Sequence, residues 1–492
     1  MPLRLRFLLD TNILIPLQDS MIALAPSLAN FVRLAGTGGH QLLYHPASVA
    51  DIQRDTDAAR RTRTLTRLRQ YNVLQAGPPC PWNTATTSVN DACDNEILFA
   101  LQNDATHALV TEDQQLHAKA KTLGLEKRVF FIQSAEDWLQ RLHQPAQVQL
   151  PHIQDVELHT LTTQLNSPFF DSLRDGYDGF DDWFRRKAQE GRSAWIYRTE
   201  GSNDLSAICI YAVQNDEPVT DAGHVLPRAA LKLCTFKVGE QVRGRKIGEL
   251  FLRASFRSAT DQQCESIFVH ANAERQGQLI ALLDDFGFSS VGLYRGDEVF
   301  VKQHPIEPPA LEMDPFEYVK RFYPHYMSGA NIQKFLVPIQ PQFHGILFPD
   351  YYQPGATLPA NHPLTDVGNA MKLAYLCHSP TNSVRAGDIV LFYRTHDLKA
   401  VTTLGVVESF DVYHSAEEIA RRVSRRTVYS RDEIAEMARK PTKVMLFRLI
   451  EHLPTPVSYA SLLNERIVGG PIQSIRKITD ESFSRILRAA RR

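Results

Sequence analysis

The chain has 492 residues with 54 Lys and Arg against 55 Asp and Glu, and its net charge of −1 excludes nucleic-acid binding through overall basicity. Its hydrophobic content of 43% suffices for several cores, and its length favours about three domains. The six cysteines form no C-x-x-C pair, which argues against a disulfide framework or a zinc site. No apolar stretch is long enough to cross a membrane, so we expect a cytoplasmic protein.

The first predicted strand covers residues 3–9, and Asp10 follows it directly. A second short apolar strand at 108–111 is followed closely by Asp113. Because open parallel sheets bind ligands at the carboxyl ends of their strands, both acids are expected to face one crevice. Two further acids are expected on helices. They are Asp51, within 45–52, and Asp94, which opens the helix at 94–101.

The motifs Leu-Leu-Asp-Thr-Asn at 8–12 and Leu-Val-Thr-Glu-Asp at 109–113, together with Asp94, resemble those of PIN-domain nucleases. The resemblance covers about residues 1–145 and implies an α/β fold with a parallel sheet. It also implies a quartet of acids that binds Mg²⁺ or Mn²⁺ for phosphodiester hydrolysis. The catalytic candidates are therefore Asp10, Asp51, Asp94 and Asp113.

The implied metal ligands are Asp10, Asp94 and Asp113, and Asp91 is a rival for Asp94. Carboxylate oxygens suit hard divalent cations, and without metal their mutual repulsion would protonate some of them. The metal would activate a water and stabilise charge on the phosphate. The alternative is that these aspartates are helix caps and turn residues of an inactive scaffold.

In the middle of the chain, strands are predicted at 206–213 and 230–238, followed by the segment 241–248 and a helix through 250–256. Two glycines between a strand and a helix predict a phosphate cradle. Glycine lets an anion approach the backbone, and the N–H groups of the helix N-terminus face that anion.

A strand at 266–272, a helix at 278–283 and a strand at 298–302 follow this cradle. The succession resembles the GNAT acyltransferase family over about residues 157–303, which implies an α+β fold with acetyl-CoA as the cofactor. The cofactor-binding candidates that follow from this resemblance are Phe236, Val238, Arg243, Gly244, Arg245, Lys246, Ile247, Gly248 and Asn272.

The chain departs from the family pattern at two positions. Lys246 stands at the first glycine of the cradle, and Leu283 stands at the usual general-acid tyrosine. Tyr294 is therefore the candidate acid for the leaving thiolate. The candidate bases that would deprotonate the amine are His224, Glu240 and His270.

Residues 304–329 contain several prolines and are predicted to form a linker. Short strands at 334–339, 388–393 and 403–407 predict a small β-rich barrel over 330–492. The phrase Arg-Ala-Gly-Asp-Ile-Val-Leu-Phe at 385–392 resembles PUA-like folds, including ASCH and EVE relatives. That resemblance implies binding of RNA or modified nucleotides.

Two arginine-rich segments, at 54–69 and 421–431, are candidate phosphate contacts, although each is also typical of a solvated helix face. The leading hypothesis is an acetyl-CoA-dependent N-acyltransferase coupled to a PIN-type ribonuclease that acts on RNA, with tRNA as one candidate. A toxin or defence role, a homo-oligomer, and an antitoxin or regulatory protein as partner are compatible with it. The alternatives are an acetyltransferase of protein or small-molecule amines on a PIN-like scaffold, and a non-enzymatic sensor of nucleotide and acetyl-CoA.

Overall fold

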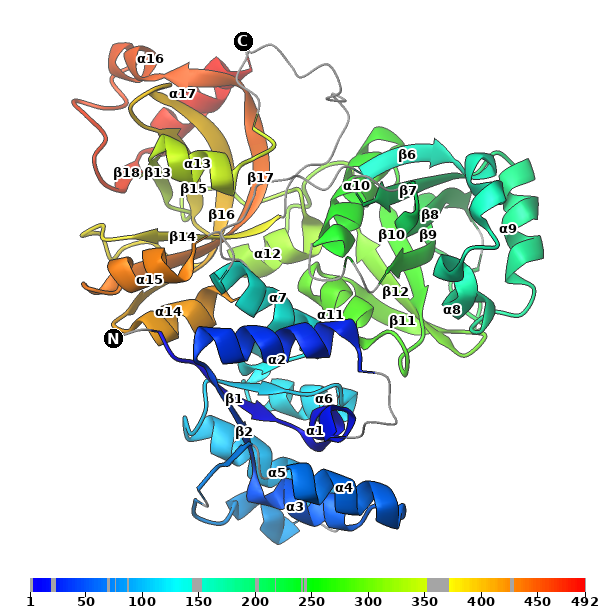
Figure 1. Ribbon diagram of the computed structural model, residues 1–492. Coiled ribbons are helices and arrows are strands. Elements are labelled where there is room, and N and C mark those ends of the chain that lie inside the picture. Colours follow the sequence, from blue (N-terminus) through cyan, green and yellow to red (C-terminus); the bar gives the residue numbers. More distant parts are fainter. Residues whose placement is uncertain are drawn as a thin grey trace. The chain divides into compact units, whose positions relative to one another are not determined.

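The computed structural model describes residues 3–18, 24–68, 71–75, 77–85, 88–143, 153–199, 203–216, 218–239, 242, 246–351, 371–424 and 429–491 (Figure 1). The chain forms two compact units. Unit 1 consists of Met1–Ala146 and Val412–Val444, and unit 2 consists of Gln147–Asp411 and Met445–Arg492. Helices long and apolar enough to cross a membrane are absent from the described residues.

Unit 1 contains a parallel sheet with the strand order β3-β2-β1-β4-β5. Its strands are β1 (Arg6–Leu9), β2 (Gln41–Tyr44), β3 (Asn72–Val73), β4 (Ala108–Val110) and β5 (Val129–Phe130). The helices of this unit are α1 (Thr11–Gln18), α2 (Pro26–Gly38), α3 (Pro46–Gln53), α4 (Ala58–Leu68), α5 (Val89–Gln102), α6 (Gln114–Thr122), α7 (Ile132–His143), α14 (Ala416–Val423) and α15 (Arg431–Met437).

Helices cover both faces of this sheet. Successive side chains of β1 point to opposite faces, so neighbouring residues contact different helices. Phe7 packs edge-on against Phe31 of α2 and Trp138 of α7. Leu8 belongs instead to a core cluster with Ile97 of α5 and Leu116 of α6. The unit is therefore a three-layer α/β sandwich, as predicted for a fold with a parallel sheet.

The first sheet of unit 2 has the strand order β11-β12-β10-β9-β8-β7-β6. Its parallel pair is β9 and β10, and the other neighbouring pairs are antiparallel. The strands are β6 (Ile153–Glu157), β7 (Ser193–Arg198), β8 (Leu205–Asn215), β9 (Ala229–Val238), β10 (Ser266–Ala271), β11 (Ser289–Tyr294) and β12 (Asp297–Gln303). Its helices are α8 (Asp171–Arg174), α9 (Phe180–Gln189), α10 (Ile247–Asp261) and α11 (Gly277–Asp285).

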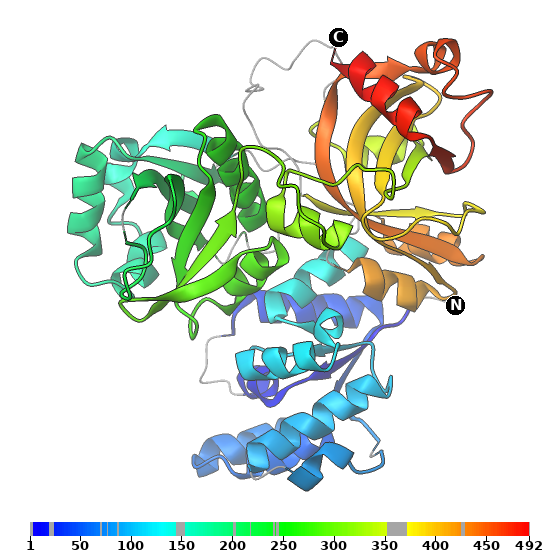
Figure 2. The same cartoon turned by 180° about the vertical axis from the view of Figure 1, so that it is seen from behind.

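The second sheet of unit 2 is mixed, with the order β14-β17-β16-β15-β13-β18 (Figure 2). Its strands are β13 (Lys334–Ile339), β14 (Lys372–Cys377), β15 (Ile389–Arg394), β16 (Ala400–Tyr413), β17 (Thr442–Ser458) and β18 (Arg476–Ile478). The accompanying helices are α12 (Pro315–Phe322), α13 (Pro341–Leu347), α16 (Tyr459–Asn464) and α17 (Asp480–Ala490). Among the described residues this order ends at β14 and β18 without closing, so the predicted barrel is not confirmed.

Part of the predicted linker 304–329 folds as helix α12. Asp314 caps its first turn by accepting hydrogen bonds from two backbone N–H groups. Tyr318, Val319 and Phe322 are buried at helical spacing, which places them on one face. Prolines precede and follow α12, but the apolar face of the helix packs it into unit 2.

Candidate functional site

The acids of unit 1 lie where the strand order of the parallel sheet changes direction. Asp10 follows β1 and Asp113 follows β4, and these two strands are neighbours at the centre of the sheet. From β1 the chain proceeds to β2 and β3 on one side and to β4 and β5 on the other. The crevice at such a point is where open α/β sheets bind ligands, so the topology brings both predicted acids to the expected edge.

Asp10 is buried and held by two hydrogen bonds. Its Oδ1 accepts from the Thr11 backbone N–H at 2.7 Å, and its Oδ2 accepts from Thr111 Oγ1 at 2.7 Å. Burial raises the pKa of Asp10, and the charges of Asp113 and Asp51 raise it further against the lowering effect of these hydrogen bonds. Hydrogen bonds therefore hold the Asp10 carboxylate close to other negatively charged side chains.

Asp94 of α5 is also affected by neighbouring carboxylates. Burial raises its pKa to about 7, and the carboxylates of Asp10 and Asp113 add to the shift. The rival Asp91 forms an ion pair with Lys119 instead. The electrostatics therefore favour Asp94 over Asp91 as the third acid of the crevice.

The other two predicted acids have local structural partners. Asp113 Oδ1 accepts from the backbone N–H groups of Gln115 and Leu116 and so caps α6. Asp51 Oδ1 accepts from Arg54 Nη2 at 2.6 Å. The contacts of Asp113 match the helix-cap alternative, whereas Asp51 lies within α3 and forms an ion pair with Arg54, and both acids still act on the pKa of Asp10.

The carboxylates suit Mg²⁺ or Mn²⁺ in donor type, and their mutual repulsion is the kind that a divalent cation relieves. Among the described residues, however, no three or more His, Cys, Asp or Glu side chains are grouped so that they could hold a metal ion. The assignment of Asp10, Asp94 and Asp113 as metal ligands therefore stays a prediction.

In unit 2, the parallel strands β9 and β10 separate partway along their length. Their pairing runs from Ala230–Ser266 to Leu233–Val269, whereas β9 continues to Val238. On its other side, β9 pairs with β8 through Leu233 and Thr235, which leaves Cys234 as an extra, unpaired residue. This β-bulge falls where β9 leaves β10, and bulges bend a strand. The result is an open strand edge from Cys234 onward.

Helix α10 begins shortly after this open edge. Lys246, the residue before it, has left-handed backbone angles of φ 58° and ψ 20°, and its side chain accepts no hydrogen bond from the N–H groups of the first turn. Uncapped N–H groups at a helix N-terminus form a site for an anion. The candidates Arg243, Gly244 and Arg245 lie outside the described residues.

Gly248 leaves room for Leu282 of α11 beside the first turn of α10. A Cβ added at Gly248 would lie 3.0 Å from Leu282 Cδ2 of α11 and 3.6 Å from Phe236 Cε1 of β9. Ile247 is buried in the core beside it, and Val238 pairs with Ala207 of β8. The described cradle residues are thus gathered at one end of the β9–β10 opening.

Asn272, predicted to lie near the cofactor, has a structural role in the turn between β10 and α11. Its Oδ1 accepts from the backbone N–H groups of Glu274 and Arg275, and its Nδ2 donates to Asp297 Oδ1 at 3.1 Å. An asparagine side chain that accepts hydrogen bonds from backbone N–H groups two and three residues later stabilises a turn. A role toward a cofactor stays a prediction.

Tyr294, the candidate acid, contacts His270, one of the candidate bases. Their ring centroids are 4.9 Å apart. Burial and the charge of Lys232 lower the pKa of His270 to about 4, and its Nε2 is buried without a hydrogen-bond partner. Of the other candidate bases, His224 is exposed and Glu240 lies outside the described residues.

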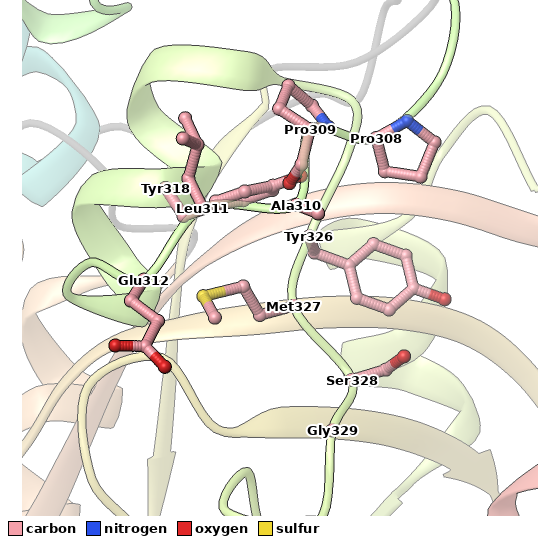
Figure 3. A pocket seen from close by; sticks show the side chains of 10 residues that line it. All are labelled: Pro308, Pro309, Ala310, Leu311, Glu312, Tyr318, Tyr326, Met327, Ser328 and Gly329. Atoms are coloured by element: carbon pink, nitrogen blue, oxygen red, sulfur yellow. The ribbon is translucent and has the colours of Figure 1, made fainter.

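A cavity of about 450 Å³ lies along the segment that joins the two sheets of unit 2. Figure 3 shows the rings of Pro308 and Tyr326 on one side of it and the side chains of Met327 and Glu312 on the other. It is lined by none of the residues predicted to bind a cofactor or metal.

The arginines of the 421–431 segment are partly used within unit 1. Arg431 Nη2 donates to the Leu3 carbonyl oxygen at 2.9 Å, and Arg421 lies 3.8 Å from a carboxylate oxygen of Asp104. These contacts attach α14 and α15 to the parallel sheet, a role for which the sequence gives no local signal.

No protein-family model matches the sequence, and no curated protein matches it. Similar solved structures include ASCH from Zymomonas mobilis, with 13% identity and a TM-score of 0.25, covering 32% of this chain and 94% of that one. Arabidopsis thaliana NAA60 in complex with acetyl-CoA has 17% identity and a TM-score of 0.24, covering 31% of this chain and 99% of that one. An IAA acetyltransferase from Bacillus cereus has 13% identity and a TM-score of 0.23, covering 31% and 97%. None of the three is described as a PIN-domain nuclease.

Proposed function

We propose that unit 2 is an acetyl-CoA-dependent N-acyltransferase whose cofactor binds between the open edge of β9 and the N-terminus of α10. The observation that carries this proposal is the separation of β9 from β10 at the Cys234 bulge. An open strand edge presents unpaired backbone N–H and C=O groups. The amide groups of a pantetheine arm can pair with them as an added strand does.

The pyrophosphate of the cofactor would bind at the uncapped first turn of α10. The helix dipole favours an anion there, and Lys246 adds a positive charge beside it. Gly248, in this turn, lies beside Phe236 of β9, so that one extended ligand can reach both the turn and the open edge of the strand.

The reaction follows from these positions. The amine nitrogen of the acceptor attacks the thioester carbonyl carbon, the C–S bond breaks, and an amide forms. The proton lost by the nitrogen balances the proton gained by the leaving thiolate. Tyr294 and His270 are the candidate groups for these transfers. An amine carried by RNA or by an RNA-associated molecule is the acceptor class that would also suit the predicted nucleotide-binding sheet.

Two measurements test the proposal. Calorimetric titration with acetyl-CoA reports binding, and mass spectrometry of amine acceptors incubated with acetyl-CoA reports a mass gain of one acetyl group. A charged tRNA, a lysine-rich peptide and a polyamine sample the acceptor classes. Binding without transfer to any acceptor would favour the sensor alternative over an enzyme.

The crevice of unit 1 supports a second candidate function, phosphodiester hydrolysis. The supporting observation is that Asp10 and Asp113 follow the neighbouring central strands β1 and β4 at the switch in strand order, where burial and the charges of these two acids raise the pKa of Asp94. These three acids are not grouped as a metal site in the described residues, so hydrolysis requires that an added Mg²⁺ or Mn²⁺ ion draw them together, and the ion would then supply an activated water and charge stabilisation on the phosphate. Cleavage of RNA that depends on the added cation, and that Asp94→Asn abolishes, would support it. Cleavage unchanged in that variant would contradict it.

A further inference from the structure

Glu249 connects the first turn of α10 to the second sheet of unit 2. It is the third residue of that helix, and only 8% of it is exposed. Its Oε1 accepts hydrogen bonds from the backbone N–H groups of Met371 at 2.6 Å and Lys372 at 2.8 Å. Lys372 begins β14, an end strand of that sheet. One side-chain oxygen therefore holds two backbone donors more than 120 residues further along the chain.

A second connection lies one turn further along α10. Arg253 Nη1 donates to Asp350 Oδ2 at 2.8 Å, and the other oxygen of Asp350 lies 3.0 Å from His452 Nε2. His452 Nδ1 is in turn 2.9 Å from Thr403 Oγ1 of β16. This chain of polar contacts runs from α10 into the buried part of the second sheet, since Thr403 is fully buried.

Helix α11, which packs against Gly248 through Leu282, is connected to the same sheet. Lys372 Nζ lies 2.6 Å from an Asp285 carboxylate oxygen, and Arg448 Nη2 donates to the Asp285 carbonyl at 2.6 Å. The apolar core is continuous as well, because Leu250 of α10 shares one buried cluster with Met371 and Val406 of the second sheet. Both helices that shape the cradle are thus fixed from outside the first sheet.

We propose that Glu249 is a positioning residue of the acyl-CoA site and that the second sheet sets the position of the cradle through it. This inference rests on the proposed function. A pyrophosphate needs the first N–H groups of α10 in one place, and small displacements of a binding group weaken a preorganised site. The hydrogen bonds from Met371 and Lys372 supply that constraint and also satisfy a carboxylate that would otherwise repel the phosphates.

The test compares Glu249→Gln with Glu249→Ala in the full-length protein. Both backbone donors bond the same oxygen, Oε1, so the amide oxygen of glutamine can accept both. Alanine leaves two buried N–H groups without an acceptor. We expect the Gln variant to bind acetyl-CoA within about twofold of the wild type, and the Ala variant to bind about tenfold or more weakly.

The kinetic readout separates positioning from chemistry. The Ala variant is expected to raise KM for acetyl-CoA with kcat nearly unchanged, because the lost interaction acts on binding. Arg257→Gln is the matched control, since Arg257 lies on the same helix with 55% of its side chain exposed, and it is expected to change neither constant. Circular dichroism and thermal melts establish that each variant is folded.

The outcomes distinguish this inference from the proposed function. Failure of the wild type to bind acetyl-CoA would overturn the proposed function itself. Wild-type binding with equal affinity in the Ala variant, or an equal loss in the Gln and Ala variants, would overturn only the positioning role. If the Ala variant does not fold, Arg253→Gln provides the test through the second connection. A several-fold rise in KM is then expected, and an unchanged KM would overturn the inference.

Discussion

Arg253 of α10 and Asp350, 97 residues later in the chain, form an ion pair of 2.8 Å in which both side chains are largely buried. The pair joins the helix that would hold a cofactor to the sheet that follows it in sequence. The two halves of unit 2 are therefore in direct contact, and α10 is bonded to a residue that lies outside the segment resembling an acyltransferase.

The first prediction concerns the stability of this pair. Burial alone would raise the pKa of Asp350, but hydrogen bonding to His452 and the charge of Arg253 lower it well below its usual range. A depressed carboxyl pKa stabilises the fold at pH values above the unfolded pKa of about 3.9, and this contribution is lost as the pH falls through the folded pKa. Asp350→Asn should cost about 3 kcal/mol at pH 7, because it leaves a buried partner charge unpaired.

Urea denaturation of the wild type and Asp350→Asn between pH 7 and pH 2 measures this effect. The difference in unfolding free energy between them should shrink below about pH 4. A difference that stays constant down to pH 2 would contradict the assignment of the pKa shift to Asp350.

The second prediction concerns Asp94, whose pKa is raised to about 7 by burial and by the charges of Asp10 and Asp113. A raised carboxyl pKa means that the folded state holds a proton that the unfolded state releases, so stability falls as the pH rises from about 4 to 7. Asp94→Asn removes this penalty. Its melting temperature should exceed that of the wild type at pH 8, and the gain should diminish at pH 5.

Asp91→Asn provides the matched control, because Asp91 belongs to the same helix but pairs with Lys119. This control should not gain stability at pH 8. Equal behaviour of the two variants would mean that the crevice does not concentrate negative charge on Asp94.

The third prediction concerns cation binding at the crevice. If Mn²⁺ or Mg²⁺ binds at Asp10, Asp94 and Asp113, it should raise the melting temperature of the wild type in a concentration-dependent way. Asp10→Asn should remove most of that rise, whereas Asp91→Asn should keep it. A rise that survives in the Asp10 variant would place the cation elsewhere.

The fourth prediction concerns Gly248, where an added Cβ would lie 3.0 Å from Leu282 Cδ2. Gly248→Ala should weaken acetyl-CoA binding several-fold, because either α10 or the Leu282 side chain of α11 must shift to accept the new methyl group. The double variant Gly248→Ala with Leu282→Ala removes the opposing atom and should recover part of the loss. Calorimetry on the three proteins checks this, and the absence of any recovery would show that contact with Leu282 does not set the helix position.

Local signals in the sequence predicted the elements that carry the two sites. The apolar run ending at Asp10 indicated a strand at whose end the acid lies, and β1 with α1 confirms this order. The glycine at 248 between a strand and a helix indicated the cradle, and α10 begins there as a helix. Both features depend on residues that are adjacent in sequence, so the local sequence pattern is enough to predict them.

Long-range contacts are the part that the sequence did not reveal. Nothing near Glu249 indicates that its carboxylate accepts from the backbone N–H groups of Met371 and Lys372, because every residue except proline supplies such a donor. The Cys234 bulge depends on the pairing register between β8 and β9, which only the folded sheet defines. Equally, the assignment of 412–444 to unit 1 depends on tertiary packing rather than on composition.

The most direct test of the central claim is calorimetric titration of the full-length protein with acetyl-CoA, with Gly248→Glu as the control. We expect saturable one-site binding by the wild type and its loss in the variant, because the glutamate would place bulk against Leu282 and negative charge at the helix N-terminus. Absence of wild-type binding, or equal binding by a folded Gly248→Glu variant, would contradict a cofactor site between β9 and α10.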